Sequence, residues 1–161
     1  AIRHHGPVIF FEHKKLYGLT GEVPAGNDAL PLCSSSTLRS GGDVTIISWS
    51  HMVHRAMQAA NELLSKGIES EVIALHSLHP LQFADIKKSI NKTEKAVIVE
   101  EDMLRGGVGA EIAAQITESS PQCRIKRVAA KNSPIGSGYF ENCIIPNKED
   151  IISACTEIVA R

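Results

Sequence analysis

From Asp43 onward, short apolar runs alternate with longer stretches in which apolar residues recur at helical spacing. Three of the short runs, 44–49, 71–75 and 96–99, are rich in β-branched residues and apolar on both faces. That pattern is typical of strands buried between two layers of helices. The run at 123–129 instead alternates apolar and basic residues, which predicts a strand with one wet face or at a sheet edge.

The stretches between these runs predict helices. Apolar residues at three- and four-residue spacing indicate helices over 52–64, 83–91 and about 107–118, and Gly67 is a suitable stop for the first. A last helix is expected after Asn147, because Asn is a good N-cap and Glu149 and Asp150 complement the helix dipole in the first turn. Strands that alternate with crossover helices predict an α/β fold, with a mostly parallel sheet covered on both faces.

Residues 1–42 have a different composition. The apolar run 7–11 is consistent with a short buried strand, and it is followed by a Gly- and Pro-rich stretch. Residues 33–42, "CSSSTLRSGG", are polar and Ser/Gly-rich, which is typical of a linker. Five apolar residues cannot form a core alone, so we expect the tail of a preceding unit plus a connection, in a protein that begins further upstream.

Composition excludes several classes of function. A net charge of −1 argues against a nucleic-acid binder, and no apolar run approaches the roughly 20 residues that cross a membrane. The four cysteines are widely spaced without a Cys-x-x-Cys pair, which indicates reduced thiols in an intracellular protein.

The stretch 97–112, "VIVEEDMLRGGVGAEI", predicts a strand, a glycine-rich turn and a helix, an arrangement that often binds phosphate. A dinucleotide fingerprint would need a third glycine where Ile112 stands, and the Lys-Ser/Thr ending of a P-loop is absent. Glu100, Glu101 and Asp102 would also repel a phosphate. We favour glycines that permit a tight turn and close helix packing; phosphate binding and an acidic surface for a basic partner stay open.

Two His-x-x-His pairs are further candidates. His51 and His54 would share one helix face and could hold a metal, although no third ligand is evident and a solvated helix start is commoner. His76 and His79 fall in an extended stretch, so they need not converge. No nucleophile elbow is present. The residues by themselves therefore predict no catalytic, cofactor-binding or metal site within this chain.

Four segments together resemble the β subunit of thiamine-diphosphate-dependent 2-oxo acid dehydrogenases of the pyruvate and acetoin type. They are "GPVIFFEHKKLYGLTGEVP", "DVTIISWSHMVHRAMQAANELLSKGIESEVIALHSLHPL", "KAVIVEEDMLRGGVGAEIAAQI" and "IIPNKEDIISACTEI". They occur in the family's order and spacing over nearly the whole chain.

The resemblance implies a division of the chain. Residues 43–161 would form a transketolase C-terminal-like domain, a three-layer α/β/α fold with a mixed, mostly parallel sheet of about five strands, one of them antiparallel. Residues 1–42 would be the end of the pyrimidine-binding domain plus a linker. The complete enzyme uses thiamine diphosphate and Mg²⁺, which in the family are held by the missing domain and the α subunit. This fragment alone is therefore expected to bind no cofactor and to be inactive.

The resemblance also implies partners: an α subunit and a second β subunit in a heterotetramer, and the subunit-binding domain of the dihydrolipoyl acyltransferase core. Glu101 aligns with an acidic position that contacts a basic side chain of that domain, and Glu100 and the terminal Arg161 are expected nearby. A homodimer of the fragment stays open, as does the choice between pyruvate and acetoin.

Two rivals remain at this point: a domain of 1-deoxyxylulose-5-phosphate synthase or another transketolase-like enzyme, and a non-catalytic interaction module. The expected location is the cytoplasm of a bacterium, or the mitochondrial matrix or plastid of a eukaryote.

Overall fold

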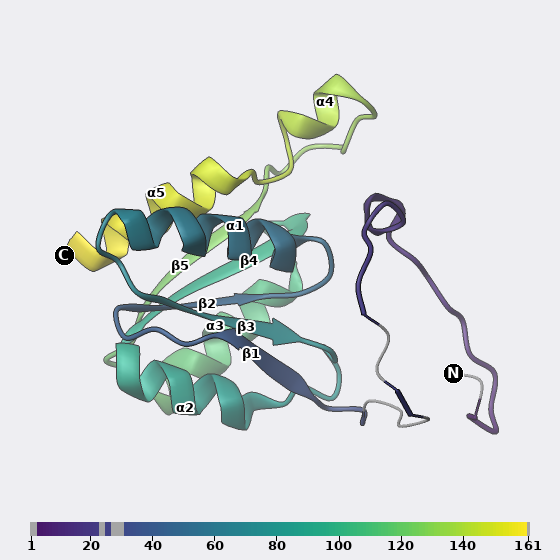
Figure 1. Cartoon of the computed structure of the whole chain (residues 1–161), viewed down its shortest axis with the longest axis horizontal. Helices are drawn as coiled ribbons and strands as arrows, with labels where there is room; N and C mark the ends of the chain where they lie inside the picture. The colour runs from purple at the N-terminus through teal and green to yellow at the C-terminus, as the bar shows by residue number, and fades with distance from the viewer. Residues whose placement is uncertain (1–2, 23–24, 27–30, 161) are drawn as a thin grey trace.

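A computed structural model describes residues 3–22, 25–26 and 31–160, and places one five-stranded sheet at the centre of the molecule (Figure 1). The strand order is β1-β3-β2-β4-β5. The strands are β1 (Ser35–Arg39), β2 (Val44–Ser48), β3 (Ser70–Leu75), β4 (Lys95–Met103) and β5 (Arg124–Ala130). Neighbouring strands run parallel except β1, which pairs antiparallel with β3. The mixed, mostly parallel sheet of the resemblance is therefore confirmed.

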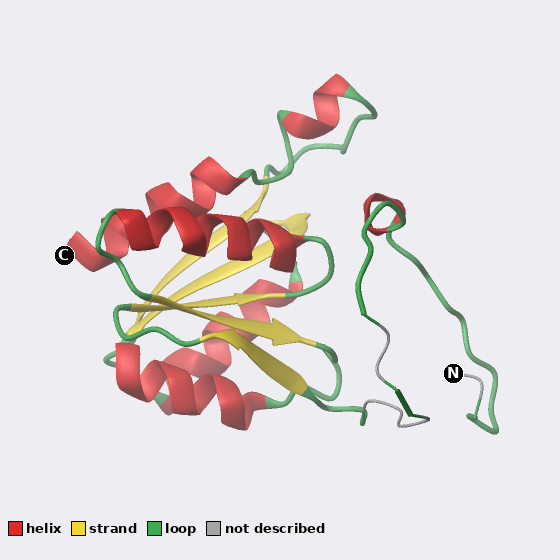
Figure 2. Ribbon diagram, in the orientation of Figure 1, coloured by secondary structure: helices red, strands yellow, loops and turns green. Residues whose placement is uncertain are grey.

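Helices cover both faces of the sheet, which makes three layers (Figures 1 and 2). Helices α1 (Met52–Ser65) and α5 (Lys148–Ala160) pack together on one face; α2 (Phe83–Thr93) and α3 (Val108–Ser119) lie on the other. Alternate residues of the buried strands point into two hydrophobic cores, one on each face of the sheet. In β4, Val97 and Val99 pack under α1 and α5, whereas Ala96 and Ile98 pack under α2 and α3.

The predicted signals at helix ends are confirmed. Gly67 adopts φ +77°, and the N–H groups of Gly67 and Ile68 donate to the carbonyls of Leu64 and Leu63, which closes α1 in a Schellman motif. At the start of α5, the Asp150 N–H donates to Asn147 Oδ1 and the Asn147 N–H donates to Asp150 Oδ2, both at 2.9 Å.

The linker prediction was wrong for residues 35–39, which form strand β1 of the sheet. This strand lies at the edge, pairs on one side with β3, and leaves all five of its residues partly or fully exposed. Its serines and threonine therefore need not be apolar, and composition alone could not identify the strand. The sheet begins before Asp43.

The run 7–11 is not a buried strand here. It has no regular structure, and Ile9, Phe10 and Phe11 expose 80%, 73% and 89% of their surface. An apolar strand needs a partner strand and a covering layer, and the described residues provide neither for it. Beyond it lies a single 3-10 turn, η1 (Lys14–Leu16), and a four-residue helix, α4 (Tyr139–Asn142), precedes α5. Among the described residues, no helix has the length and apolar character to cross a bilayer.

Candidate functional site

The candidate site lies at the carboxyl end of β4, the strand that carries the acidic residues before the glycine turn. Successive side chains of a strand point to opposite faces. Glu100 accordingly points to the α3 face, and Glu101 points to the α1 face. The two neighbouring acids therefore have different surroundings and different roles.

Glu100 is fully buried, and its carboxylate is held at both oxygens. Oε2 accepts a hydrogen bond of 2.9 Å from the backbone N–H of Gly109, in the first turn of α3. Oε1 accepts one of 2.9 Å from Nη2 of Arg127 on the adjacent strand β5. The carboxylate thus satisfies an N–H at the positive end of α3 and neutralises a guanidinium.

The glycines of the turn make room for this carboxylate. A Cβ added at Gly109 would lie 2.3 Å from Oε1 of Glu100, and one at Gly107 would lie 2.7 Å from Oε2. No side chain larger than hydrogen fits at either position without displacing Glu100. The prediction of a tight, closely packed turn is correct, and the group that the turn encloses is a carboxylate of the same chain.

A thiamine diphosphate does not fit at this turn. Glu100 already occupies the space and bonds the N–H of Gly109 that would otherwise be available to a phosphate oxygen. The sequence left phosphate binding open. It is disfavoured here because Glu100 fills the space in the turn and because the acidic residues would repel a phosphate.

The prediction that Glu100 contacts a partner needs correction, because its side chain is 0% exposed and faces the interior. Arg161, the third predicted contact residue, lies outside the described residues. Glu101 is the predicted contact residue that reaches solvent, with 22% of its side chain exposed.

Glu101 lies between two histidines. Its Oε2 is 2.9 Å from Nε2 of His13, and its Oε1 is 3.6 Å from Nδ1 of His51. The two imidazole rings stack with centroids 5.2 Å apart and 12° between their planes. Nδ1 of His13 accepts from the Lys15 N–H at 3.2 Å, so Nε2 of the neutral ring carries the proton and donates to Glu101.

The structure separates the two histidines that the sequence paired. His51 is half-buried beside Glu101, and burial lowers the pKa of its imidazole even though the Glu101 carboxylate acts in the opposite direction. His54, one turn further along α1, is exposed and does not join the cluster. His76 bonds the Ser36 hydroxyl at 2.8 Å, and it likewise forms no group with His79.

His13 was missed at the sequence level because 88 positions separate it from Glu101. The sequence feature that could have indicated this contact is the position of His51 and Glu101 after neighbouring predicted strands. His51 follows strand β2 and Glu101 lies near the end of β4, and these adjacent parallel strands bring their carboxyl ends to one edge of the sheet. A segment crossing that edge can contact both. Lys15 of the same segment is paired with Glu141 at 2.5 Å.

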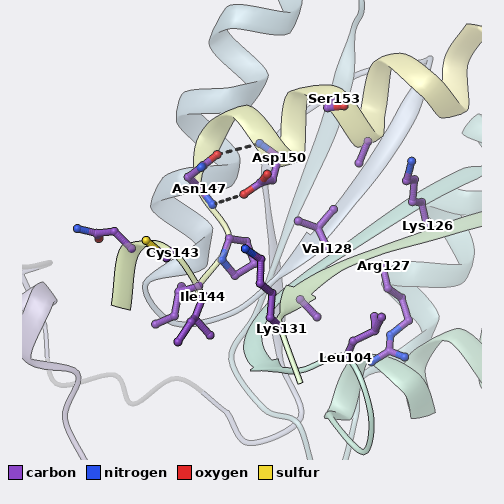
Figure 3. A pocket seen from close by; sticks show the side chains of 15 residues that line it. Leu104, Lys126, Arg127, Val128, Lys131, Cys143, Ile144, Asn147, Asp150 and Ser153 are labelled. Atoms are coloured by element: carbon purple, nitrogen blue, oxygen red, sulfur yellow. Dashed lines mark hydrogen bonds between the residues drawn. The ribbon is translucent and has the colours of Figure 1, made fainter. Parts of the chain in front are cut away.

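A groove of ≈ 550 Å³ lies along β5, the loop before α5 and the start of α5 (Figure 3). Val128 and Ile144 contribute apolar surface, and Lys131 lies across the groove from the Asn147–Asp150 hydrogen bonds. Lys126 and Arg127 are paired with Glu157 and Glu100. These side chains supply no nucleophile–base pair. The four cysteines, Cys33, Cys123, Cys143 and Cys155, are free thiols, as expected.

Comparisons with known proteins agree with this architecture. The family described as "Transketolase, C-terminal domain" matches residues 35–151. The pyruvate dehydrogenase E1 component subunit beta of Gracilaria tenuistipitata var. liui is 42% identical over 99% of this chain and 50% of its own length. The acetoin:2,6-dichlorophenolindophenol oxidoreductase subunit beta of Cupriavidus necator is 38% identical over 96% of this chain and 47% of its own length.

The chain spans about half the length of these relatives. Among solved structures, a split-gene transketolase described as an inactive β4 tetramer superposes with a TM-score of 0.76, at 24% identity, over 87% of this chain and 46% of that one. The family match begins at Ser35, the first residue of β1, so sequence family and observed sheet share the same start. The chain belongs to the transketolase C-terminal domain family.

Proposed function

We propose that this chain is the carboxyl-terminal half of the β subunit of a thiamine-diphosphate-dependent 2-oxo acid dehydrogenase, of the pyruvate or acetoin type. The observation that carries the proposal is the alignment of 96–99% of the chain with about half of such subunits. These relatives favour a dehydrogenase subunit over 1-deoxyxylulose-5-phosphate synthase and over a non-catalytic module. The complete protein would be an oxidoreductase, and its compartment would follow the organism, as in the relatives from bacteria and from rice mitochondria.

Within that enzyme, this half would assemble rather than catalyse. Thiamine diphosphate and Mg²⁺ would be bound by the preceding domain and by the α subunit, since the glycine turn of this chain is filled by Glu100. The roles left to this half are pairing with a second β subunit in the heterotetramer and docking to the acyltransferase core. The exposed apolar run 7–11 is consistent with a place in the preceding domain.

Docking would use the acidic end of β4. Asp102 is exposed there, beside the accessible part of Glu101, and together they offer negative charge to a basic subunit-binding domain. Glu100 takes no direct part, because it is buried. Its pairing with Arg127 would instead hold the end of β4 in place, and Arg161 remains a proposed neighbour of the docking surface.

The docking proposal is tested by charge reversal in the complete αβ assembly. Glu101→Lys is expected to weaken binding of a recombinant subunit-binding domain by about 2–5 kcal/mol if the pair is desolvated. Glu118→Lys is the matched control, because Glu118 is exposed at the far end of α3. Equal affinities for the parent and Glu101→Lys assemblies, measured by calorimetry, would remove Glu101 from the docking surface.

The enzymatic proposal is tested by reconstitution. The complete β subunit and its α subunit are mixed and assayed for dye reduction that depends on thiamine diphosphate, with pyruvate and acetoin as separate substrates. Activity with either substrate supports the assignment and names the type. A purified, assembled heterotetramer that reduces the dye with neither substrate nor with other 2-oxo acids would contradict it.

A further inference from the structure

We propose that His13, His51 and Glu101 form a binding site for one divalent cation of the zinc type, which joins the N-terminal segment to the domain. The inference is independent of the proposed function, since it depends on the local geometry of three side chains. A metal site was considered at the sequence level for His51 and His54, without a third ligand. The structure replaces His54 by two ligands from elsewhere in the chain.

The donor atoms are already gathered. One nitrogen of each histidine and a carboxylate oxygen of Glu101 all lie within 4.8 Å of one another. His13 Nε2 lies 2.9 Å from Oε2 of Glu101 and His51 Nδ1 lies 3.6 Å from Oε1, so the two histidines face different oxygens of one carboxylate. A tetrahedral zinc with bonds of about 2.0–2.2 Å sets its ligands about 3.3–3.5 Å apart. The two rings are only 12° from parallel, and a metal lies in the plane of each imidazole that binds it, so at least one ring must rotate to complete the coordination.

Two atoms of the cluster have unmet bonding capacity. Nδ1 of His51 and Oε1 of Glu101 are both buried, and neither has a hydrogen-bond partner among the described residues. Their separation of 3.6 Å is too long for a good hydrogen bond. Buried polar atoms left in this condition are destabilising, and a cation between them would satisfy both.

The ligand types also suit zinc. Two imidazoles and one carboxylate make up the three-ligand set of many zinc sites, in which water or another ligand takes the fourth position. The cluster is accessible, since the side chains of His13, His51 and Glu101 expose 27%, 14% and 22% of their surface.

Metal binding has a cost at His13. Without a metal, Nδ1 of His13 accepts a hydrogen bond from the Lys15 N–H. A metal at Nε2 would move the ring proton to Nδ1, and this hydrogen bond would be lost. That contact is long, at 3.2 Å, and exposed, so water can replace it. Positive charge nearby is a second cost, because the charges of Arg55 and Lys15 act on His51, although the Lys15 ammonium is paired with Glu141.

The test is a calorimetric titration of the metal-free 161-residue chain with Zn²⁺, repeated with Co²⁺ to read tetrahedral coordination from its visible absorption. One ion per chain is expected. His51→Gln and Glu101→Gln should each weaken binding about tenfold or more, and His13→Gln likewise. His54→Gln is the matched control, because it removes an exposed imidazole from the same helix, and it should bind as the parent does.

Several outcomes overturn the inference: no saturable Zn²⁺ binding by the parent, affinity unchanged in His51→Gln or Glu101→Gln, or affinity lost in a His4→Gln, His5→Gln variant. Urea unfolding of each metal-free variant shows whether it is folded. Glu101→Asp keeps a carboxylate, and its titration with Zn²⁺ provides a second measurement. The reconstitution assay does not depend on the zinc titration, and the docking assay, which shares Glu101, is run without Zn²⁺ so that its result stays separate.

Discussion

At the residue scale, the decisive feature is the opposite orientation of Glu100 and Glu101. Glu100 bonds Gly109 and Arg127 inside the molecule, while Glu101 meets two histidines near the surface. The sequence predicted that the acids would repel a phosphate and that the glycines would pack closely. It did not predict that one acid fills the space left by the glycines, because their proximity depends on how β4 turns into α3.

Gly109→Ala is expected to destabilise the fold. The added methyl group would lie 2.3 Å from Glu100 Oε1, so the carboxylate must shift and its bonds weaken. The free energy of unfolding in urea should fall by about 1–3 kcal/mol. Gly42→Ala is the control: a Cβ there meets nothing within 4 Å, and a change within about 0.5 kcal/mol is expected.

Testing Gly109→Ala in a Glu100→Ala variant separates the steric clash with Glu100 from other effects of the added methyl group. Glu100→Ala removes the carboxylate, so the additional loss caused by Gly109→Ala should shrink by about 1 kcal/mol or more in that background. An equal loss in both backgrounds would show that Glu100 is not what the glycine accommodates.

At the scale of elements, the sequence predicted the buried strands and the four long helices well. Their apolar periods reflect burial between layers, and their ends carry signals such as Gly67 and Asn147. Prediction from the sequence failed where a segment is buried on one side only or is largely exposed. Strand β1 is a polar edge strand, and the apolar run 7–11 lies exposed, so in both places composition gave the wrong environment.

Helix α2 and strand β3 are joined by an ion pair that makes stability depend on pH. Burial alone would raise the pKa of Glu71, but the Lys92 ammonium, 2.5 Å away, and the Ser89 hydroxyl together lower it below its ordinary value. The folded state therefore releases this proton more readily than the unfolded chain. The resulting stabilisation is complete above the ordinary pKa of about 4.3 and is lost as pH falls through the lower, folded value.

Lys92→Met should accordingly lower the free energy of unfolding by about 1 kcal/mol at pH 7, and by less at about pH 3. Urea unfolding at both pH values measures the difference. Lys87→Met, on an exposed position of the same helix, should change little at either pH. A difference between Lys92→Met and the parent that is the same at both pH values would contradict the coupling to Glu71.

At the scale of the whole molecule, the cluster of His13, His51 and Glu101 joins a segment from the first 22 residues to the edge where β2 and β4 end. A periodic pattern in the sequence describes neighbours within one element. It says nothing about which distant segment crosses a sheet edge, so the sequence identified His51 and Glu101 separately and could not bring them together. The fold could be predicted because its signals are local, and the site could not because its contacts are long-range.

In the whole molecule, the glycine turn packs against Glu100, and we propose that the cofactor of the complete enzyme is bound by parts outside this chain. Calorimetric titration of the 161-residue chain with thiamine diphosphate and Mg²⁺ tests it most directly, with the complete heterotetramer as the positive control. Saturable binding is expected for the heterotetramer and none for the chain alone. Stoichiometric binding of thiamine diphosphate by the chain alone would contradict it.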